Sequence, residues 1–206
     1  MKAILISIRP NWVAKILNGE KTIEIRKTMP KCDLPIDVYI YCTKDRDNLY
    51  RHFKGEFVLL KETRKECLWN GKVVAKFTLN KVEKISLPYT KFGKLEWVGC
   101  ENERTLQTIS LDEKDLLKLS CLSEEEIYYY LNFKHSPNKC GYAWHIDNLV
   151  VFDKPKELSE FIKTTCKGCP FENTQICHND IDGKLCRITK APQSWCYVEA
   201  QIWAIN

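Results

Sequence analysis

The sequence predicts a small mixed α+β fold, a β-barrel of about five to seven strands with few helices. Strand-like segments recur over the whole length of the 206 residues, with one helix expected near the start and a helical pair in the middle. A doubly wound parallel sheet would instead need helices that alternate regularly with strands. The pattern therefore favours the barrel.

Strands are expected where β-branched, aromatic and other apolar residues cluster or alternate with polar residues. These segments are residues 3–8, 22–27, 36–42, 72–86, 141–152 and 194–205. The segment 72–86 is long enough to bend. Residues 44–70 are charged and poorly periodic, and residues 87–110 contain Pro88, Gly93 and Gly99 among aromatic residues, so no strand is assigned to either segment.

Helices are expected at three places, from apolar spacing and from residues that begin or end helices. The first helix covers residues 11–18, with Asn11 as its N-cap and Gly19 directly after its last turn. Two capping boxes open the helical pair in the middle of the chain. Their residues are Ser110 with Glu113, and Ser123 with Glu126.

Composition limits the classes of function. The chain carries 32 Lys and Arg against 27 Asp and Glu, a formal net charge of +5. This charge allows weak attraction to phosphate without the strong field of a protein that wraps duplex DNA. No apolar run approaches the roughly 18 residues that a membrane span needs, and no export signal is recognised. We therefore expect a single cytoplasmic domain over residues 1–206 that does not insert in a membrane.

The segment GEKTIEIRK, residues 19–27, combines a glycine, alternating isoleucines and the charged residues Lys21, Glu24 and Arg26. Alternation places Ile23 and Ile25 on the core face, with Glu24 and Arg26 on the opposite face. Two cations beside one carboxylate suit an anionic or hydrogen-bonding ligand, since arginine grips phosphate or a base edge bidentately. The alternative is an ordinary solvated edge strand with a weak surface ion pair.

The pattern G-x-K-x-x-E-x-R formed by Gly19, Lys21, Glu24 and Arg26 resembles the ASCH domain, a branch of the PUA-like β-barrel superfamily. The preceding LISIRPNWVAKILNGEK and the later YAWHIDNLVVFDKPKEL are similar to the first and closing parts of that family, so the resemblance spans residues 1–160, with two long gaps of low similarity at residues 44–70 and 87–120. It implies a PUA-like barrel that recognises RNA or a modified nucleobase or nucleotide.

The resemblance also implies an enzymatic alternative. Some small members are amidohydrolases of acetylated cytidine nucleosides that use a Lys, a Thr three residues later and a Glu from a helix. Lys21 matches, and Glu125 lies in the corresponding helical region, but Glu24 occupies the position of the Thr nucleophile. Opposite charges side by side keep both groups ionised, whereas a lysine base must lose its proton. Binding is therefore favoured over a nucleoside amidohydrolase or a ribonuclease, and a protein-interaction module is the third alternative.

Further ligand-binding candidates flank the motif or lie on the closing strand. They are Arg9, Thr22, Trp144 and His145. Trp144 could stack a base, as aromatic residues do in many single-strand binding proteins, although strand aromatics are more often core residues. His145 has the opposite parity on the strand and is the second aromatic candidate.

Four of the eleven cysteines lie close together with the spacing C-x2-C-x7-C-x8-C. They are Cys166, Cys169, Cys177 and Cys186. Four thiolates suit a tetrahedral structural Zn²⁺ in a polar loop that cannot build its own core. An iron–sulfur cluster, a redox pair and unliganded thiols are the alternatives. The sequence therefore predicts a Cys-rich insert over residues 163–190.

Overall fold

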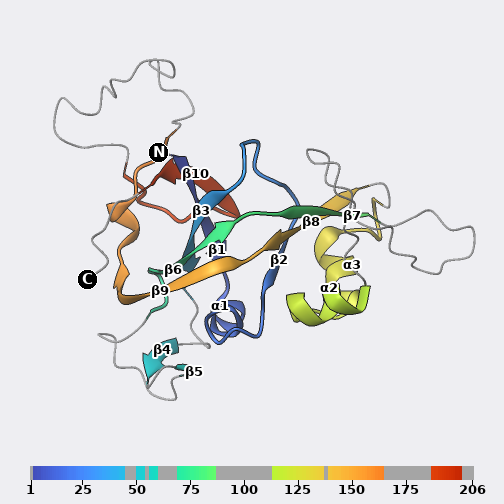
Figure 1. Cartoon of the computed structure of the whole chain (residues 1–206), viewed down its shortest axis with the longest axis horizontal. Coiled ribbons are helices and arrows are strands. Elements are labelled where there is room, and N and C mark those ends of the chain that lie inside the picture. Colours follow the sequence, from blue (N-terminus) through green and yellow to red (C-terminus); the bar gives the residue numbers. More distant parts are fainter. Residues whose placement is uncertain are drawn as a thin grey trace, which may run out of the picture. The chain divides into compact units, whose positions relative to one another are not determined.

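The chain is described here by a computed structural model (Figure 1). The described residues are 2–44, 50–53, 56–59, 69–86, 113–136, 139–164 and 187–200. They belong to two compact units: residues 1–18, 36–78 and 148–206 form unit 1, and residues 19–35 and 79–147 form unit 2. Strands and a few helices occur in both units, so the predicted α+β class is confirmed.

Unit 1 contains a five-stranded sheet with the order β10-β1-β3-β6-β9. Its strands are β1 (Lys2–Ile8), β3 (Ile36–Cys42), β6 (Val73–Leu79), β9 (Asp147–Lys156) and β10 (Trp195–Glu199). Strand β1 pairs in parallel with β3 and antiparallel with β10. It is buried from Ala3 to Ile8, which explains its nearly continuous apolar sequence.

The helix of unit 1 begins earlier than the sequence predicted. Helix α1 spans Pro10–Leu17 and its N-cap is Arg9, so the expected cap Asn11 lies inside the helix. Proline is favoured at the first helical position because it lacks the amide proton that would otherwise have no partner there. Gly19 has a φ of 77° just beyond the helix, as the prediction of a helix-ending glycine required.

Two short strands occur in a segment to which no strand was assigned. Strands β4 (Tyr50–Phe53) and β5 (Glu56–Leu59) pair antiparallel inside residues 44–70. Each of the two strands has only four residues, too few to show a clear period in the sequence. A 3₁₀ turn, η2 (Leu158–Glu160), follows β9.

Unit 2 is a three-stranded sheet with two helices on one face. The sheet has the order β2-β8-β7 and consists of β2 (Ile23–Arg26), β7 (Val82–Ser86) and β8 (Cys140–His145). Helices α2 (Glu113–Ser120) and α3 (Glu124–Leu131) are the helices among the described residues of the unit. Strand residues such as Ile25 and Ala143 form one core with Ile127 and Leu131 of α3. The predicted capping box of Ser123 and Glu126 opens α3, whereas Ser110 lies outside the described residues.

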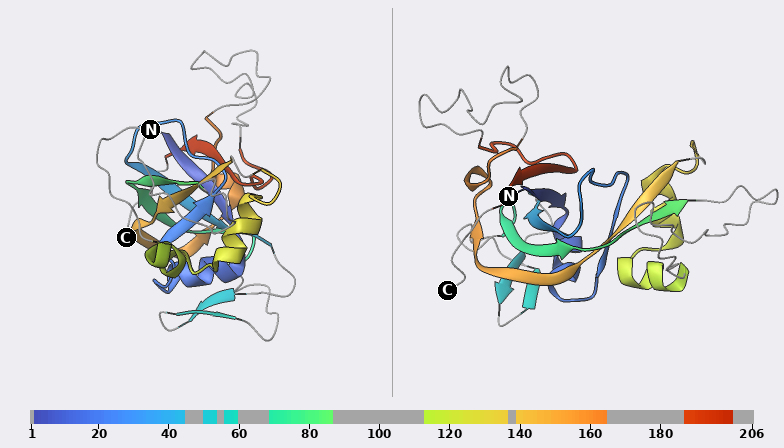
Figure 2. Two further views of the ribbon diagram at one scale, coloured as in Figure 1. Left: turned by 90° about the vertical axis from the view of Figure 1, so that its right-hand side faces the viewer. Right: turned by 45° about the horizontal axis from the view of Figure 1, so that its top comes forward.

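Two expected single strands are each divided between two sheets. Figure 2 shows both segments from two further directions, residues 72–86 in green and residues 141–152 in orange. Residues 72–86 form β6 and β7, and residues 141–152 form β8 and the start of β9. Ile146 separates β8 from β9, and Asn148, the second residue of β9, has a φ of 48°. Asn80, between β6 and β7, donates a hydrogen bond from Nδ2 to Oδ2 of Asp147, the first residue of β9, at 3.2 Å.

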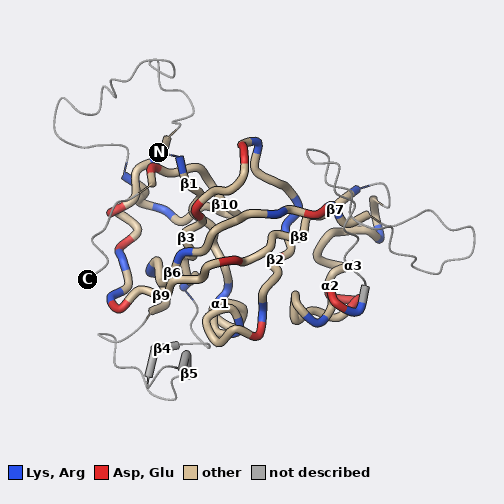
Figure 3. The backbone as a smooth tube through the Cα atoms, in the orientation of Figure 1, with Lys and Arg blue, Asp and Glu red and all other residues tan. Residues whose placement is uncertain are grey.

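Charges are mixed along the described chain (Figure 3), in keeping with the small net charge of the sequence. None of the described helices reaches the length and hydrophobicity that a membrane-spanning helix needs.

Candidate functional site

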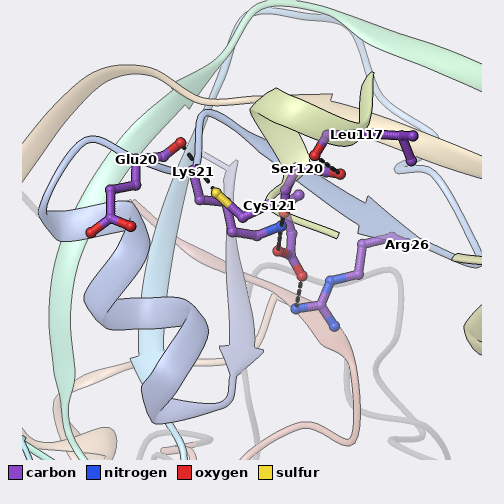
Figure 4. A network of polar contacts seen from close by, with 7 residues as sticks. Glu20, Lys21, Arg26, Leu117, Ser120 and Cys121 are labelled. Carbon is purple, nitrogen blue, oxygen red and sulfur yellow. Dashed lines mark hydrogen bonds and ion pairs between the residues drawn. The ribbon is translucent and has the colours of Figure 1, made fainter. Parts of the chain in front are cut away.

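Three charged side chains at the start of unit 2 form a buried group, which we call the Lys21–Glu24–Arg26 cluster. Lys21 Nζ lies 3.3 Å from Glu24 Oε2, and Arg26 Nη2 lies 3.1 Å from Glu24 Oε1. One carboxylate therefore holds two cations, one on each oxygen. Figure 4 shows Lys21 reaching Ser120 and the guanidinium of Arg26 approaching the shared carboxylate.

Lys21 is anchored at the C-terminus of α2. Its Nζ donates a hydrogen bond to the carbonyl of Ser120, the last residue of the helix, at 2.6 Å. Cys121 then turns the chain with a φ of 53°, and its amide donates to the carbonyl of Lys118. A cation at a helix C-terminus satisfies a carbonyl that has no partner within the helix and interacts favourably with the helix dipole. The helix thus fixes the position of the ammonium group.

The cluster is buried, contrary to the alternative of a solvated edge strand. Side-chain exposure is 2% for Lys21, 10% for Glu24 and 8% for Arg26. Alternation correctly placed Ile23 and Ile25 in the core, but the opposite face of β2 is buried as well. Removing one member of a buried ion pair typically costs about 3–5 kcal/mol, because the remaining charge has lost its partner in a medium that solvates it poorly.

Strand register extends the face that carries the cluster. Glu24 of β2 lies opposite Trp144 of β8, and Trp144 lies opposite Val82 of β7. Directly opposed residues of antiparallel strands share a face, so these side chains form one row across the sheet. Trp144 is 0% exposed. It is a core residue in this structure, in agreement with the core alternative for strand aromatics rather than with stacking of its ring on a base.

His145 belongs to a second buried acid–base group on the other face of the sheet. Its Nε2 lies 2.6 Å from Glu83 Oε2, and Lys81 Nζ lies 2.7 Å from Glu83 Oε1. Burial acts to raise the pKa of Glu83, but hydrogen bonds from His145 and Lys81, together with their charges, lower it below its usual value. Sequence reasoning missed Glu83, since an acidic residue inside a strand gives no local sign that it is buried.

The remaining candidates of unit 2 and unit 1 have different environments. Thr22 is half-buried and its backbone is held on both sides, by the carbonyl of Leu119 and by the amide of Ile146. Glu125 is exposed in the first turn of α3. An acidic side chain at this position interacts favourably with the helix dipole whether or not it belongs to a site. Arg9 is exposed at the start of α1 and belongs to unit 1.

The predicted metal site lies outside the described residues. All four cysteines of the C-x2-C-x7-C-x8-C pattern fall between residues 165 and 186. Within the part of the chain that the structure describes, no three His, Cys, Asp or Glu side chains come together as a metal site. Zinc binding therefore stays a prediction from the sequence.

Comparison with known proteins returns similar folds but no similar sequence. No protein-family model and no curated protein matches the sequence. The fold is similar to a crystal structure of ASCH from Zymomonas mobilis, with 16% identity, a TM-score of 0.47 and coverage of 96% of this chain and 87% of that chain. For a mutant of the same protein the identity is 15%, the TM-score 0.48 and the coverage 96% and 88%.

Proposed function

We propose that the protein binds RNA or a nucleotide-like ligand at the Lys21–Glu24–Arg26 cluster. The observation that supports this proposal is the sharing of one buried carboxylate by two cations at 3.3 and 3.1 Å. Two positive charges and one negative charge give the three side chains a net charge of +1. Burial of charge is costly unless opposite charge or hydrogen bonds compensate it, so an anionic group is a favourable addition to this cluster.

Each residue has a separate role in the proposed complex. Arg26 offers a planar fork of donors that fits a phosphate or the edge of a base, and Lys21 adds a point charge. Glu24 compensates the charge of both cations while no ligand is bound, and an anionic ligand would compete with its carboxylate for them. Because water is largely excluded from these side chains, each such interaction is stronger than on an open surface.

Binding is supported better than amide hydrolysis. The ammonium of Lys21 donates to the Ser120 carbonyl at 2.6 Å and lies 3.3 Å from Glu24, so both neighbours interact with its proton-bearing form. A lysine that serves as a base or a nucleophile must give up that form. In addition, the carboxylate of Glu24 stands where the related amidohydrolases carry a threonine hydroxyl.

The test is titration of fluorescently labelled single-stranded RNA into the wild type and into Lys21→Met, Arg26→Gln and Glu24→Gln. Loss of a charge-assisted contact is worth about 1.5–3 kcal/mol, so the two cation variants should bind about tenfold more weakly or worse. Glu24→Gln should bind at least as tightly as the wild type, because the ligand no longer competes with a carboxylate for the two cations.

Lys76→Met is the matched control, since it also removes one positive charge but from a surface pair with Asp37 in unit 1. Thermal unfolding of each variant identifies any that fail to fold. Equal affinities of Lys21→Met, Arg26→Gln and Lys76→Met would remove the cluster from the binding site. Weakened binding by a folded Glu24→Gln would also contradict the proposal, since the carboxylate would then be the group that meets the ligand.

A further inference from the structure

We infer that the cluster is one end of a longer strip on the same face of the β2-β8-β7 sheet, and that its ligand is a single-stranded oligonucleotide rather than a free mononucleotide. We call this strip the Arg26–Tyr142–Lys84 row. The inference rests on the proposed function and deepens it, because it names the length and chemistry of the ligand.

Register defines the row. Arg26 of β2 pairs with Tyr142 of β8, and Tyr142 pairs with Lys84 of β7. The three side chains therefore lie side by side on one face, next to the row that starts at Glu24. Among the described strand residues of this face, the only acidic side chain is that of Glu24.

Exposure increases along the face in the direction of the new row. Glu24, Trp144 and Val82 are all buried, with whole-residue exposures of 8%, 0% and 6%. In the next row Tyr142 and Lys84 are half-buried, so solvent reaches this part of the face. A ligand that contacts the row can therefore continue towards solvent, while its end meets Arg26.

The spacing of the row suits more than one nucleotide. Two strand spacings separate the backbones at Arg26 and Lys84, a distance of about 10 Å. This separation favours contacts of the two cations with successive phosphates over a shared grip on one. Tyr142 lies between them and supplies an aromatic side chain on which a base can stack, the usual partner of a cationic groove in single-strand binding. Cys140 Sγ donates to Tyr142 Oη at 3.4 Å and helps to hold the ring.

The opposite side of unit 2 supplies matched controls. Tyr130 is 40% exposed on α3, the helix that packs against the other face of the sheet, and Lys27 Nζ lies 5.2 Å from the centre of its ring. Lys118 is exposed in the last turn of α2. Substitutions of Tyr130 and Lys118 change the same chemical groups in the same unit without touching the row.

The experiment measures the affinities of uridine monophosphate, a short oligouridine and a short oligothymidine by anisotropy or calorimetry over a range of salt concentrations. Lys84→Gln should reduce the slope of log K against log salt by about 0.7 for the oligonucleotides, the value for one phosphate contact to a single strand. It should leave the affinity for uridine monophosphate unchanged. Tyr142→Leu should weaken oligonucleotide binding by about fivefold or more, and Tyr142→Phe should restore it because the ring is retained.

The controls Lys118→Gln and Tyr130→Leu should bind like the wild type. Binding of either oligouridine or oligothymidine in this pattern supports the row, since both share the phosphate backbone and the base faces. If Lys84→Gln and Lys118→Gln have the same salt slope, or if uridine monophosphate binds as tightly as the oligonucleotides, the row is refuted. In that case the proposed function still stands if Arg26→Gln weakens binding. If Arg26→Gln leaves the affinity unchanged, both the row and the proposed function are refuted.

Discussion

Substitution of Gly141 by alanine tests how closely α3 packs on the sheet of unit 2. A Cβ at this position would lie 2.4 and 2.6 Å from the two methyl carbons of Leu131 and 3.0 Å from its Cγ. Carbon atoms in contact need about 3.5–4.0 Å, so the methyl carbons must move by about 1 Å. Leu131 is 3% exposed and shares its core with Ile127 and Phe133, which leave it little room. We expect Gly141→Ala to lower the free energy of unfolding by about 1–3 kcal/mol, as overpacking does.

A double-mutant cycle distinguishes this steric clash from a general loss of stability, because the clash predicts the sign of the coupling energy between the two substitutions. Leu131→Ala alone should cost about 2–5 kcal/mol through the cavity that it leaves. In the double variant the added methyl at position 141 enters the space that the leucine vacated, so the two losses should not add. We expect the double variant to be more stable than the sum predicts by about 0.5–3 kcal/mol.

Urea unfolding followed by far-ultraviolet circular dichroism provides the four free energies of the cycle. The slopes against urea must agree among the variants for the comparison to hold. Additive losses, or a Gly141→Ala variant as stable as the wild type, would show that α3 does not approach β8 as closely as the structure places it.

Three further outcomes are expected. The pKa of Glu83 is lowered from its usual 4.5, so its contribution to stability is present above about pH 4.5 and is lost as the pH falls through the lower folded value. Urea unfolding from pH 3 to 7 should show this loss of stability in the wild type, and the stability of Glu83→Gln should depend less on pH. Ser123→Ala removes the hydroxyl that accepts from Glu126 at the start of α3 and should cost about 1 kcal/mol in the same assay, while an unchanged stability would contradict the cap. Elemental analysis of the purified protein should find one zinc for each chain, and its removal should expose residues 163–190 to protease before the rest of the chain; protein without zinc or iron would refute the four-thiolate site.

Local features of the fold could be predicted because neighbouring residues determine them. The capping box of Ser123 and Glu126 and the helix-ending Gly19 depend on a few consecutive residues. The first strands likewise follow from apolar composition. The charged residues of the candidate site were also identified from the sequence, since Glu24 and Arg26 alternate with Ile23 and Ile25 directly after Gly19 and Lys21.

Other features depend on residues that are distant in the chain. The division of residues 72–86 into β6 and β7 follows from the membership of these strands in two different sheets, and a continuous strand-like composition does not reveal it. Glu83 likewise becomes significant only because β8 brings His145 to its carboxylate.

The sequence by itself determined which charged residues stand together on β2 and which elements surround them. Only the tertiary structure decided that these charges are buried, and that Lys21 donates to the carbonyl of Ser120, 99 residues further along the chain. Alternation along a strand distinguishes its two faces, but it does not reveal whether water or other parts of the chain cover each face. Burial and helix-end contacts depend on packing between remote segments, and this packing places the two cations in a buried candidate anion site.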